Sequence, residues 1–309
     1  MVDLVIISYN GKSLTAEAIE SAIANTLPPS KIIVVDNNSS DGSVEYLKDK
    51  FKQIEIVPLN KNYGYGKAAN LGVQKSTASY VVISNNDVIF PKNFFEGIRN
   101  LIHKIEANLG IIGFQQIYPD GLFQNSYGKF HTLISGLLDV TLISLVEIRI
   151  RKLRWKFGFR KVREVDYVDG AVICVNKSAF AKVGGFDENF FFYSEEVDLA
   201  KRMKGAGFKV FIDENNVVIH YRGQGANKQG LSLTSVKLLP ESRALYCKKH
   251  LPTMNARFYM FLQAIYYKEL SILLRLKKMF STIDVTEQIS LTDLISKEFW
   301  RLARKYSHI

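Results

Sequence analysis

The chain has 309 residues, 47% of them hydrophobic, and a mean hydropathy of −0.01, which excludes a disordered or fibrous protein and allows a sizeable core. Two cysteines, Cys174 and Cys247, are too few for a disulfide framework or a cysteine-rich zinc site, so we expect a reducing compartment. The net charge of +11 fits an anionic partner such as phosphate, anionic lipid or nucleic acid, although a solubilising surface explains it equally well.

Strands and helices are predicted to alternate over the first 115 residues. Short apolar runs rich in β-branched residues predict buried strands at 4–8, 32–35, 54–58, 80–84 and 110–114. Amphipathic segments between them predict helices at about 14–23, 43–51, 65–74 and 91–106, the last with Pro91 as its first residue. This alternation favours an α/β fold with a mostly parallel sheet, whose ligands bind at the carboxyl ends of the strands.

The regular pattern weakens after residue 115. An apolar segment at 133–148 is interrupted by two acids and predicts one helix that packs on protein or rests on lipid. Eight basic side chains and no acid follow in residues 149–163. Further strands are expected at 166–175, 208–212 and 217–219, and further helices at 176–183 and 194–206, the latter capped by Ser194.

Two parts of the chain are predicted. Residues 1–225 form an α/β domain with an apolar and basic insertion around 130–163, and residues 226–309 form a basic, amphipathic, helical region. No segment has the length and apolarity of a transmembrane helix, and the first ten residues predict a strand rather than a signal peptide. We therefore expect a cytoplasmic protein.

Polar side chains follow two of the predicted strands. Asp36 comes directly after strand 32–35, where a carboxylate can accept hydrogen bonds from a nucleobase or ribose, although it can also cap the next helix. Asn85, Asn86 and Asp87 follow strand 80–84. An aspartate with neighbouring amides can ligate Mg²⁺ or Mn²⁺, although a simple turn explains the pattern equally well.

Three further clusters have chemical potential. The glycines in loop 60–72 would let backbone N–H groups approach phosphate, but their spacing matches no nucleotide-binding motif. Glu195, Glu196 and Asp198 crowd a helix start, where like charges raise at least one pKa and create a proton acceptor, or where they simply favour the helix dipole. His220 ends strand 217–219 and is a ligand or a structural side chain.

Taken in order along the chain, these clusters resemble the family 2 glycosyltransferases, which have the GT-A fold. The resemblance covers about residues 2–225, and its rhamnosyltransferase and galactofuranosyltransferase branch is nearest. The matching stretches are VIISYNGK (5–12), IVVDNNSSDGS (33–43), NKNYGYGKAANLG (60–72), VVISNNDV (81–88), VGGFDENFFFYSEEVDLAKRMKGAGF (183–208) and VVIHYRG (217–223).

The resemblance implies a role for each matching residue. A nucleotide-diphosphate sugar would contact Ser8, Tyr9, Asn10, Asp36, Asn38, Asn62, Gly64, Asn70, Asn85 and Asn86. Gly170 and Ala171 would form the floor beneath the acceptor, and Asp87 with His220 would bind Mg²⁺ or Mn²⁺. Glu196 would be the catalytic base, with Glu195 and Asp198 as alternatives.

The implied reaction is an inverting transfer of a sugar from dTDP-rhamnose or a UDP-sugar to a hydroxyl of a polysaccharide or lipid-linked glycan. The basic and apolar segments 133–163 and 258–278 would then contact an anionic membrane from the cytoplasmic side, or another copy of the chain, and no nucleic-acid partner is expected.

Two other function classes stay open. A sugar-1-phosphate nucleotidyltransferase would have a glycine-rich basic loop where residues 8–11 read Ser-Tyr-Asn-Gly, and a non-catalytic module for anionic membrane or nucleic acid leaves the acids at 195–198 unexplained.

Overall fold

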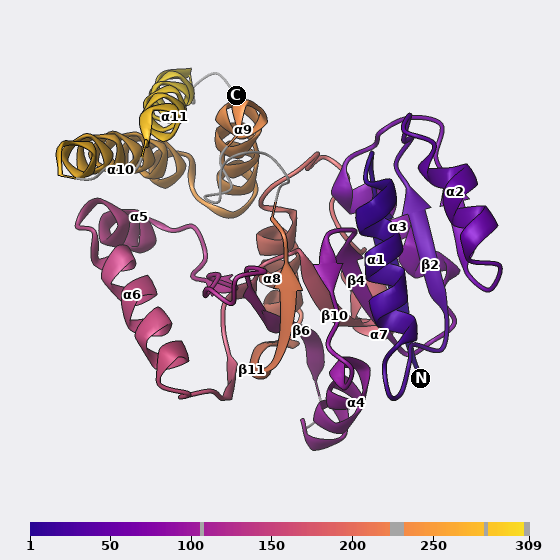
Figure 1. The fold of residues 1–309 in the computed structure, drawn as a ribbon. Coiled ribbons are helices and arrows are strands. Elements are labelled where there is room, and N and C mark those ends of the chain that lie inside the picture. Colours follow the sequence, from indigo (N-terminus) through magenta and orange to yellow (C-terminus); the bar gives the residue numbers. More distant parts are fainter. Residues whose placement is uncertain (106–107, 223–231, 281–283, 306–309) are drawn as a thin grey trace. The chain divides into compact units, whose positions relative to one another are not determined.

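The fold was obtained as a computed structural model that describes residues 1–105, 108–222, 232–280 and 284–305 (Figure 1). The chain divides into two compact units. Unit 1 comprises Met1–Gly128, Arg154–Phe191 and the described residues from Glu195 to 222; unit 2 comprises Lys129–Leu153, Phe192–Ser194 and the described residues from 232 onward. The domain boundary expected at 225/226 lies outside the described residues.

A nine-stranded sheet forms the centre of unit 1 among the described residues, in the order β3-β2-β1-β4-β10-β6-β11-β5, with β8 also paired to β11. The strands are β1 (Val2–Ser8), β2 (Ile32–Asp36), β3 (Glu55–Pro58), β4 (Tyr80–Asn85), β5 (Val88–Ile89), β6 (Leu109–Ile117), β8 (Val162–Glu164), β10 (Val172–Asn176) and β11 (Lys209–His220). The pairs among β1 to β4 and the pair β6–β11 are parallel, whereas β10 is antiparallel to β4 and β6. Two short strands, β7 (Tyr127–Gly128) and β9 (Tyr167–Val168), pair separately.

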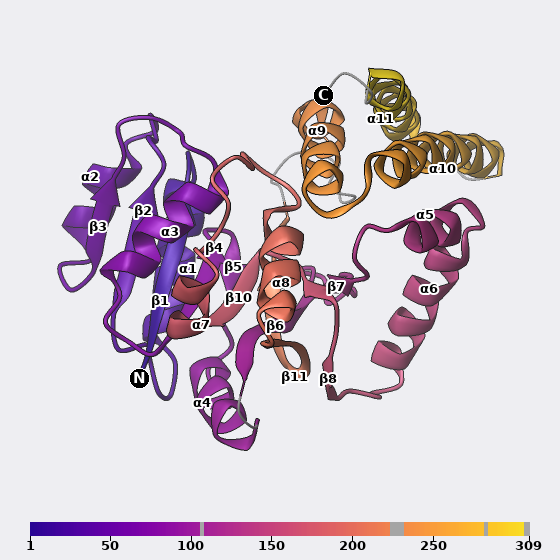
Figure 2. The same cartoon turned by 180° about the vertical axis from the view of Figure 1, so that it is seen from behind.

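Helices cover both faces of this sheet, which is why the central strands β1 and β2 are buried at every position (Figures 1 and 2). The helices of unit 1 are α1 (Lys12–Ile23), α2 (Ser43–Lys50), α3 (Tyr65–Lys75), α4 (Phe94–Lys104), α7 (Lys177–Lys182) and α8 (Glu195–Gly205). Leu4 and Ile6 face the core formed with α1 and α4, whereas Val5 faces Gly72 of α3 on the other side. The predicted α/β architecture with a mostly parallel sheet is confirmed.

Several boundaries differ from the sequence-based expectation. Helix α4 begins at Phe94 with Asn93 at its N-cap, so Pro91 precedes the helix instead of opening it. The helix expected at 133–148 is two helices, α5 (Leu133–Val140) and α6 (Ile143–Lys156), because Leu142 adopts a left-handed backbone with φ 58°. Ser194 also has a positive φ of 65°, unlike the extended conformation expected of an N-cap.

Two strand predictions also need correction. The strands expected at 208–212 and 217–219 form one strand, β11, which begins at Lys209 and changes register between Asp213 and Val217. The strand expected at 166–175 is interrupted after Val168, where three residues form the turn that leads into β10.

Unit 2 is helical and contains α5, α9 (Leu233–His250), α10 (Thr253–Met279) and α11 (Thr286–Lys305). Buried residues of α10 such as Tyr259 and Tyr267 pack in this unit, and the Tyr267 ring stacks on Phe299 of α11. None of the helices found among the described residues has the length and apolarity needed to cross a bilayer.

Candidate active site at the carboxyl edge of the sheet

The ends of three neighbouring parallel strands bring the predicted donor-binding residues to one edge of the sheet. Ser8 at the end of β1 is the register partner of Asp36 at the end of β2, and Asn85 at the end of β4 is opposite Ile7. Parallel strands that start on the same side necessarily end on the same side, so residues far apart in sequence become neighbours. All seventeen predicted site residues lie in unit 1.

Asp36 is buried and held in a fixed orientation by the loop that follows it. The backbone N–H and the hydroxyl of Ser39 donate to its two carboxylate oxygens at 2.8 and 2.6 Å. Asn10 and Asn38 both adopt left-handed backbones, with φ 48° and 69°, and Asn10 donates its N–H to the Ser39 hydroxyl. The Tyr9 ring is half exposed beside them, so this edge combines a rigid acceptor with an aromatic surface.

Ser8 and Asn86 are joined through a residue that sequence analysis missed. The Thr15 hydroxyl lies 2.9 Å from the Ser8 hydroxyl and accepts from Asn86 Nδ2 at 3.1 Å. Gly11 gives Asn86 room, because a Cβ there would lie 2.1 Å from its amide nitrogen. The polar ends of β1 and β4 are therefore locked together by α1.

The loop before α3 is positioned by close backbone packing. Gly64 has φ 83°, and a Cβ at this position would lie 2.4 Å from the carbonyl oxygen of Phe191. The N–H of Gly64 donates to the side chain of Asn62, and Asn70 forms hydrogen bonds with both backbone groups of Phe186. Asn62 and Asn70 thus shape the loop in this structure.

Asp87 and His220 face one another across the ends of β5 and β11. Asp87 Oδ1 lies 3.3 Å from His220 Nε2, and His220 Nδ1 lies 2.8 Å from Oε1 of Gln116. Gln116 donates its amide to Asp169, so its oxygen must accept from His220, which places the proton on Nδ1. In the neutral imidazole this tautomer places the Nε2 lone pair on the side of the Asp87 carboxylate.

Two acceptor atoms at this separation fit a shared cation. In an octahedral site with ligand distances of about 2.1 Å, adjacent ligands are about 3 Å apart, close to the spacing of Asp87 Oδ1 and His220 Nε2. The described residues contain no group of three or more His, Cys, Asp or Glu side chains that could hold a metal ion. Asp87 and His220 would therefore leave positions for water and for oxygens of a bound phosphate.

The acid pair at the start of α8 is electrostatically asymmetric. Glu195 is buried, and this burial, followed by the negative charges of Glu196 and Asp169, raises the pKa of Glu195 well above its usual value. Glu196 is only half-buried. Burial therefore disfavours a second negative charge on Glu195 next to the more accessible Glu196.

The acids adjoin the turn that begins β10. A Cβ on Gly170 would lie 3.3 Å from Cβ of Glu196, and the Gly170 carbonyl accepts from the Tyr65 hydroxyl at 2.8 Å. Burial raises the pKa of Tyr65 far above its usual value, and the nearby charges of Glu195 and Glu196 add to the shift, so the phenol remains a neutral donor.

Asp169 connects this turn to the histidine. Its carboxylate accepts from Gln116 at 3.1 Å and from the Ala171 N–H at 3.0 Å, and Asn85 donates its N–H to the Ala171 carbonyl. Neither Asp169 nor Gln116 was predicted. The signal for Gln116 is its place in a glutamine pair at the end of the apolar run 109–114.

Asp198 has different surroundings from the other acids. It is fully buried, and its Oδ2 lies 2.7 Å from two nitrogens of Arg202, which also donates to the Val183 carbonyl at 2.6 Å. The ion pair lies within α8, and the hydrogen bond from Arg202 to Val183 ties the helix to the residue before the glycine turn.

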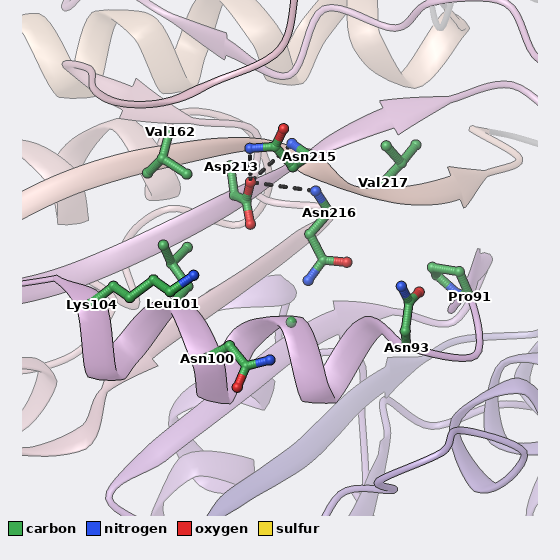
Figure 3. A pocket seen from close by; sticks show the side chains of 11 residues that line it. Pro91, Asn93, Asn100, Leu101, Lys104, Val162, Asp213, Asn215, Asn216 and Val217 are labelled. Carbon is green, nitrogen blue, oxygen red and sulfur yellow. Dashed lines mark hydrogen bonds between the residues drawn. The ribbon is translucent and has the colours of Figure 1, made fainter.

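A separate cavity of about 550 Å³ lies between α4 and the irregular part of β11 (Figure 3). Asn93 and Asn100 of α4 and Asp213 and Asn216 of β11 line it, and none of the predicted site residues does. Asp213 accepts hydrogen bonds from its own turn, so the cavity is distinct from the edge that carries Asp36, Asp87 and Glu196.

The comparison with known proteins bears on this arrangement. The model of glycosyl transferase family 2 matches residues 3–174, more than half of the chain. The chain belongs to glycosyl transferase family 2. The enzyme is thus a glycosyltransferase, as the sequence predicts, and its match includes β1, β2 and β4 with their polar ends.

Among curated relatives, the enzyme is 24% identical over 249 residues to the N-acetylglucosaminyl-diphospho-decaprenol L-rhamnosyltransferase of Mycobacterium tuberculosis, covering 75% of this chain and 80% of the relative. It is 25% identical over 223 residues to the O-antigen chain rhamnosyltransferase RfbN of Salmonella typhimurium, covering 71% and 66%. These names support the predicted rhamnosyltransferase-like branch.

Solved structures support the predicted GT-A fold. A mannosyltransferase from Pyrobaculum calidifontis, in complex with GDP-mannose and Mn²⁺, aligns with a TM-score of 0.59 and 12% identity over 99% of this chain and 86% of that one. Staphylococcus aureus TarS aligns with a TM-score of 0.54 and 11% identity over 99% of this chain and 53% of that one.

Proposed function

We propose that the enzyme transfers a sugar, with inversion at the anomeric carbon, from a nucleotide diphosphate to a hydroxyl of a glycan. One observation carries the proposal: a continuous set of hydrogen bonds joins the facing pair Asp87 and His220, through Gln116 and Asp169, to the turn beside Glu196. A centre for the departing diphosphate therefore adjoins a proton acceptor in unit 1.

The donor would lie across the strand ends. Asp36 accepts hydrogen bonds from the nucleobase, and the exposed Tyr9 ring lies beside it. Asn85, Asn86 and Gly64 line the path from the base towards Asp87, on which the diphosphate would extend. Because Asp36 is anchored by Ser39, recognition needs little ordering of the carboxylate when the donor binds.

Asp87 and His220 would hold Mg²⁺ or Mn²⁺, and this cation supplies charge stabilisation to the departing diphosphate. The Pyrobaculum mannosyltransferase, which shares this fold, binds Mn²⁺ together with its donor, and this supports a divalent metal here. Gln116 keeps the Nε2 lone pair of His220 available for this role, because its Oε1 accepts a hydrogen bond from Nδ1–H. Asn85 stands where the family has an acid, so the site carries one negative charge fewer.

Glu196 acts as the base in the transfer step. Its carboxylate takes the proton of the acceptor hydroxyl while that oxygen forms a bond to the anomeric carbon. The bond from that carbon to the diphosphate oxygen breaks, and the nucleoside diphosphate leaves with the electron pair. The raised pKa of Glu195 disfavours a second negative charge beside Glu196. Asp198 positions the helix through its ion pair with Arg202.

We place the enzyme among transferases that use dTDP-rhamnose or a UDP-sugar and extend a polysaccharide or a lipid-linked glycan at the cytoplasmic face of the membrane. The support is that two relatives are named rhamnosyltransferases, one for a diphospho-decaprenol lipid and one for an O-antigen chain. The acceptor would rest on Gly170 and Ala171, because the Glu196 side chain packs directly against Gly170.

A donor screen followed by product analysis tests the function. Thermal denaturation with dTDP-rhamnose, UDP-sugars and GDP-sugars, each with and without Mn²⁺, identifies the donor, because a ligand that binds only the folded protein raises its Tm. Incubation with that donor and glycan acceptors should release nucleoside diphosphate and give a product whose anomeric configuration, measured by NMR, is opposite to that of the donor. Retained configuration, or release of pyrophosphate instead, would exclude the proposed reaction.

A further inference from the structure

Helix α6 is unusual because its apolar residues are exposed. All fourteen of its residues are described, and none is buried. Ile143, Val146, Ile150 and Leu153 follow one another at spacings of three and four, so they form one stripe along the helix, and each is between 44% and 56% exposed. A surface helix of a globular protein normally turns such a stripe towards the core.

A stripe of basic residues runs beside the apolar one. Arg149, Lys152 and Lys156 are exposed and also follow the helical spacing of three and four. At 100° per residue they lie on the flank of the apolar stripe, so the exposed face of α6 is half apolar and half cationic. Basic side chains beside an apolar surface keep their charges in water while their methylene stems cover it.

The acid of α6 is kept away from this face. Glu147 is half-buried and pairs with Lys129 at 2.6 Å and with Arg151 at 4.0 Å. It is the only acidic residue in the sequence of α6, so the exposed face carries cations without a balancing negative charge. A purely cationic exposed face matches an anionic surface, whereas a protein partner with mixed charges would be matched by a face that carries both signs.

The chain that leaves α6 adds aromatic groups. Phe157 and Phe159 flank Gly158, whose φ of 74° turns the chain, and both rings are 67% exposed. Arg160 stacks on the Trp155 ring at 4.1 Å from its centroid. Exposed phenylalanines next to arginine and tryptophan suit the boundary between headgroups and acyl chains.

From this face we infer that α6 and the following turn, residues 143–160, bind the surface of an anionic phospholipid bilayer, with the apolar stripe inserted among the acyl chains and the basic stripe against the headgroups. The helix would lie in the plane of the membrane, since it is too short and too charged to span it. The inference does not depend on the identity of donor or acceptor. It does supply a means by which the proposed transferase would reach a lipid-linked glycan.

Vesicle co-flotation of the full chain tests the basic stripe. Vesicles of phosphatidylcholine with 30% phosphatidylglycerol (a composition of about one anionic lipid in three) should carry the protein to the top of the gradient, and pure phosphatidylcholine vesicles should carry far less. Lys152→Gln with Lys156→Gln should weaken partitioning roughly 25-fold, since each basic side chain near such a surface contributes a factor of about five. Lys48→Gln with Lys92→Gln removes the same charge from exposed positions elsewhere and should change little.

A second pair of variants tests the apolar stripe. Ile150→Ser with Leu153→Ser should lower partitioning by at least about tenfold, because both side chains leave the acyl region. Leu27→Ser with Leu122→Ser is the matched control, because these leucines are equally exposed, at 47% and 52%. Donor-dependent thermal shifts should be the same in all variants, which separates membrane binding from the catalytic site.

Insertion itself can be followed at a single residue. Both native cysteines are buried, so Val146→Cys offers one accessible thiol for an environment-sensitive dye, whose emission should shift to the blue with anionic vesicles. Dye on Leu27→Cys should not respond. The inference is overturned if the native chain ignores anionic vesicles, if both α6 variants partition like their controls, or if they change only the size of the protein in lipid-free chromatography, which would make α6 a contact between copies.

Discussion

Replacing Glu196 by glutamine tests the assignment of the base most directly. The substitution keeps the size of a half-buried side chain beside Gly170 and removes its ability to accept a proton. General-base catalysis typically contributes a factor of 10² to 10⁴, so kcat should fall by that much, which is about 3 to 5 kcal/mol in activation free energy. Donor affinity should stay near normal, because the nucleobase of the donor would bind at Asp36, which Ser39 holds in place away from Glu196.

The expected loss of kcat in Glu196→Gln is best compared with that of a substitution at the neighbouring acid, Glu195. Glu195 is buried, and its raised pKa favours the neutral acid, which Glu195→Gln mimics. We expect a loss of kcat of no more than about threefold at neutral pH, because no charge is removed from the site. The two variants of adjacent residues should therefore differ by at least about 30-fold.

Steady-state release of nucleoside diphosphate measures kcat, and calorimetric titration of the donor measures affinity. Asp198→Asn serves as the control for damage to α8: it breaks a buried ion pair with Arg202 and should lower the free energy of unfolding by about 3 kcal/mol or more. The base assignment is refuted if Glu196→Gln keeps a tenth of the native kcat, or if Glu195→Gln loses as much as Glu196→Gln.

Three further predictions concern the metal site, pH and the backbone. Asp87→Ala should abolish the part of donor binding that depends on Mn²⁺ in calorimetry, and His220→Ala should weaken it; identical titrations of both variants with Mn²⁺ and with EDTA would contradict the metal role. The pKa of Glu195 is raised in the folded state, so above about pH 4.3 the folded protein binds more protons than the unfolded chain. The free energy of unfolding of the native protein should therefore decline as the pH rises from there to the folded pKa, by up to about 1.4 kcal/mol per pH unit relative to Glu195→Gln. Parallel thermal denaturation curves of the two proteins from pH 4 to 8 would refute this. Gly64→Ala should cost more than Gly42→Ala in urea denaturation. Gly42, with φ 75° and ψ 20°, is in the left-handed helical region, which costs alanine about 1 kcal/mol. Gly64, with φ 83° and ψ 176°, is in a region that essentially only glycine adopts, and its new Cβ would also lie 2.4 Å from a carbonyl oxygen; equal losses would show that both the backbone and the contact relax freely.

The parts of the fold that the sequence predicts are those whose signal is local. Runs such as 32–35 and 81–83 are apolar throughout because both faces of the sheet are covered, and polar residues after such a run mark the strand end. For this reason Asp36 and Asp87 could be placed at one edge of a sheet without coordinates.

The parts that escaped prediction depend on long-range contacts. Asp169 and Gln116 are 53 residues apart, and nothing in either local sequence indicates that the two will meet. In the sequence Thr15 is an ordinary helix residue, and its hydrogen bond with Asn86 joins positions 71 residues apart. The break between α5 and α6 is equally hidden, because Leu142 is a residue type that rarely adopts a positive φ.

The reversed direction of β10 has a consequence for how such an enzyme can diversify. Because β6 ends and the neighbouring β10 begins at the same edge, the whole excursion from residue 118 to 171 departs from and returns to the catalytic edge. The closure entropy of a loop grows only slowly with its length, so the helical part of this excursion, α5 and α6, can be lengthened, shortened or exchanged at small cost to the sheet. The donor-binding residues on β1, β2 and β4 lie outside this part. Acceptor specificity and membrane binding can therefore change between related enzymes while the nucleotide-binding residues stay the same.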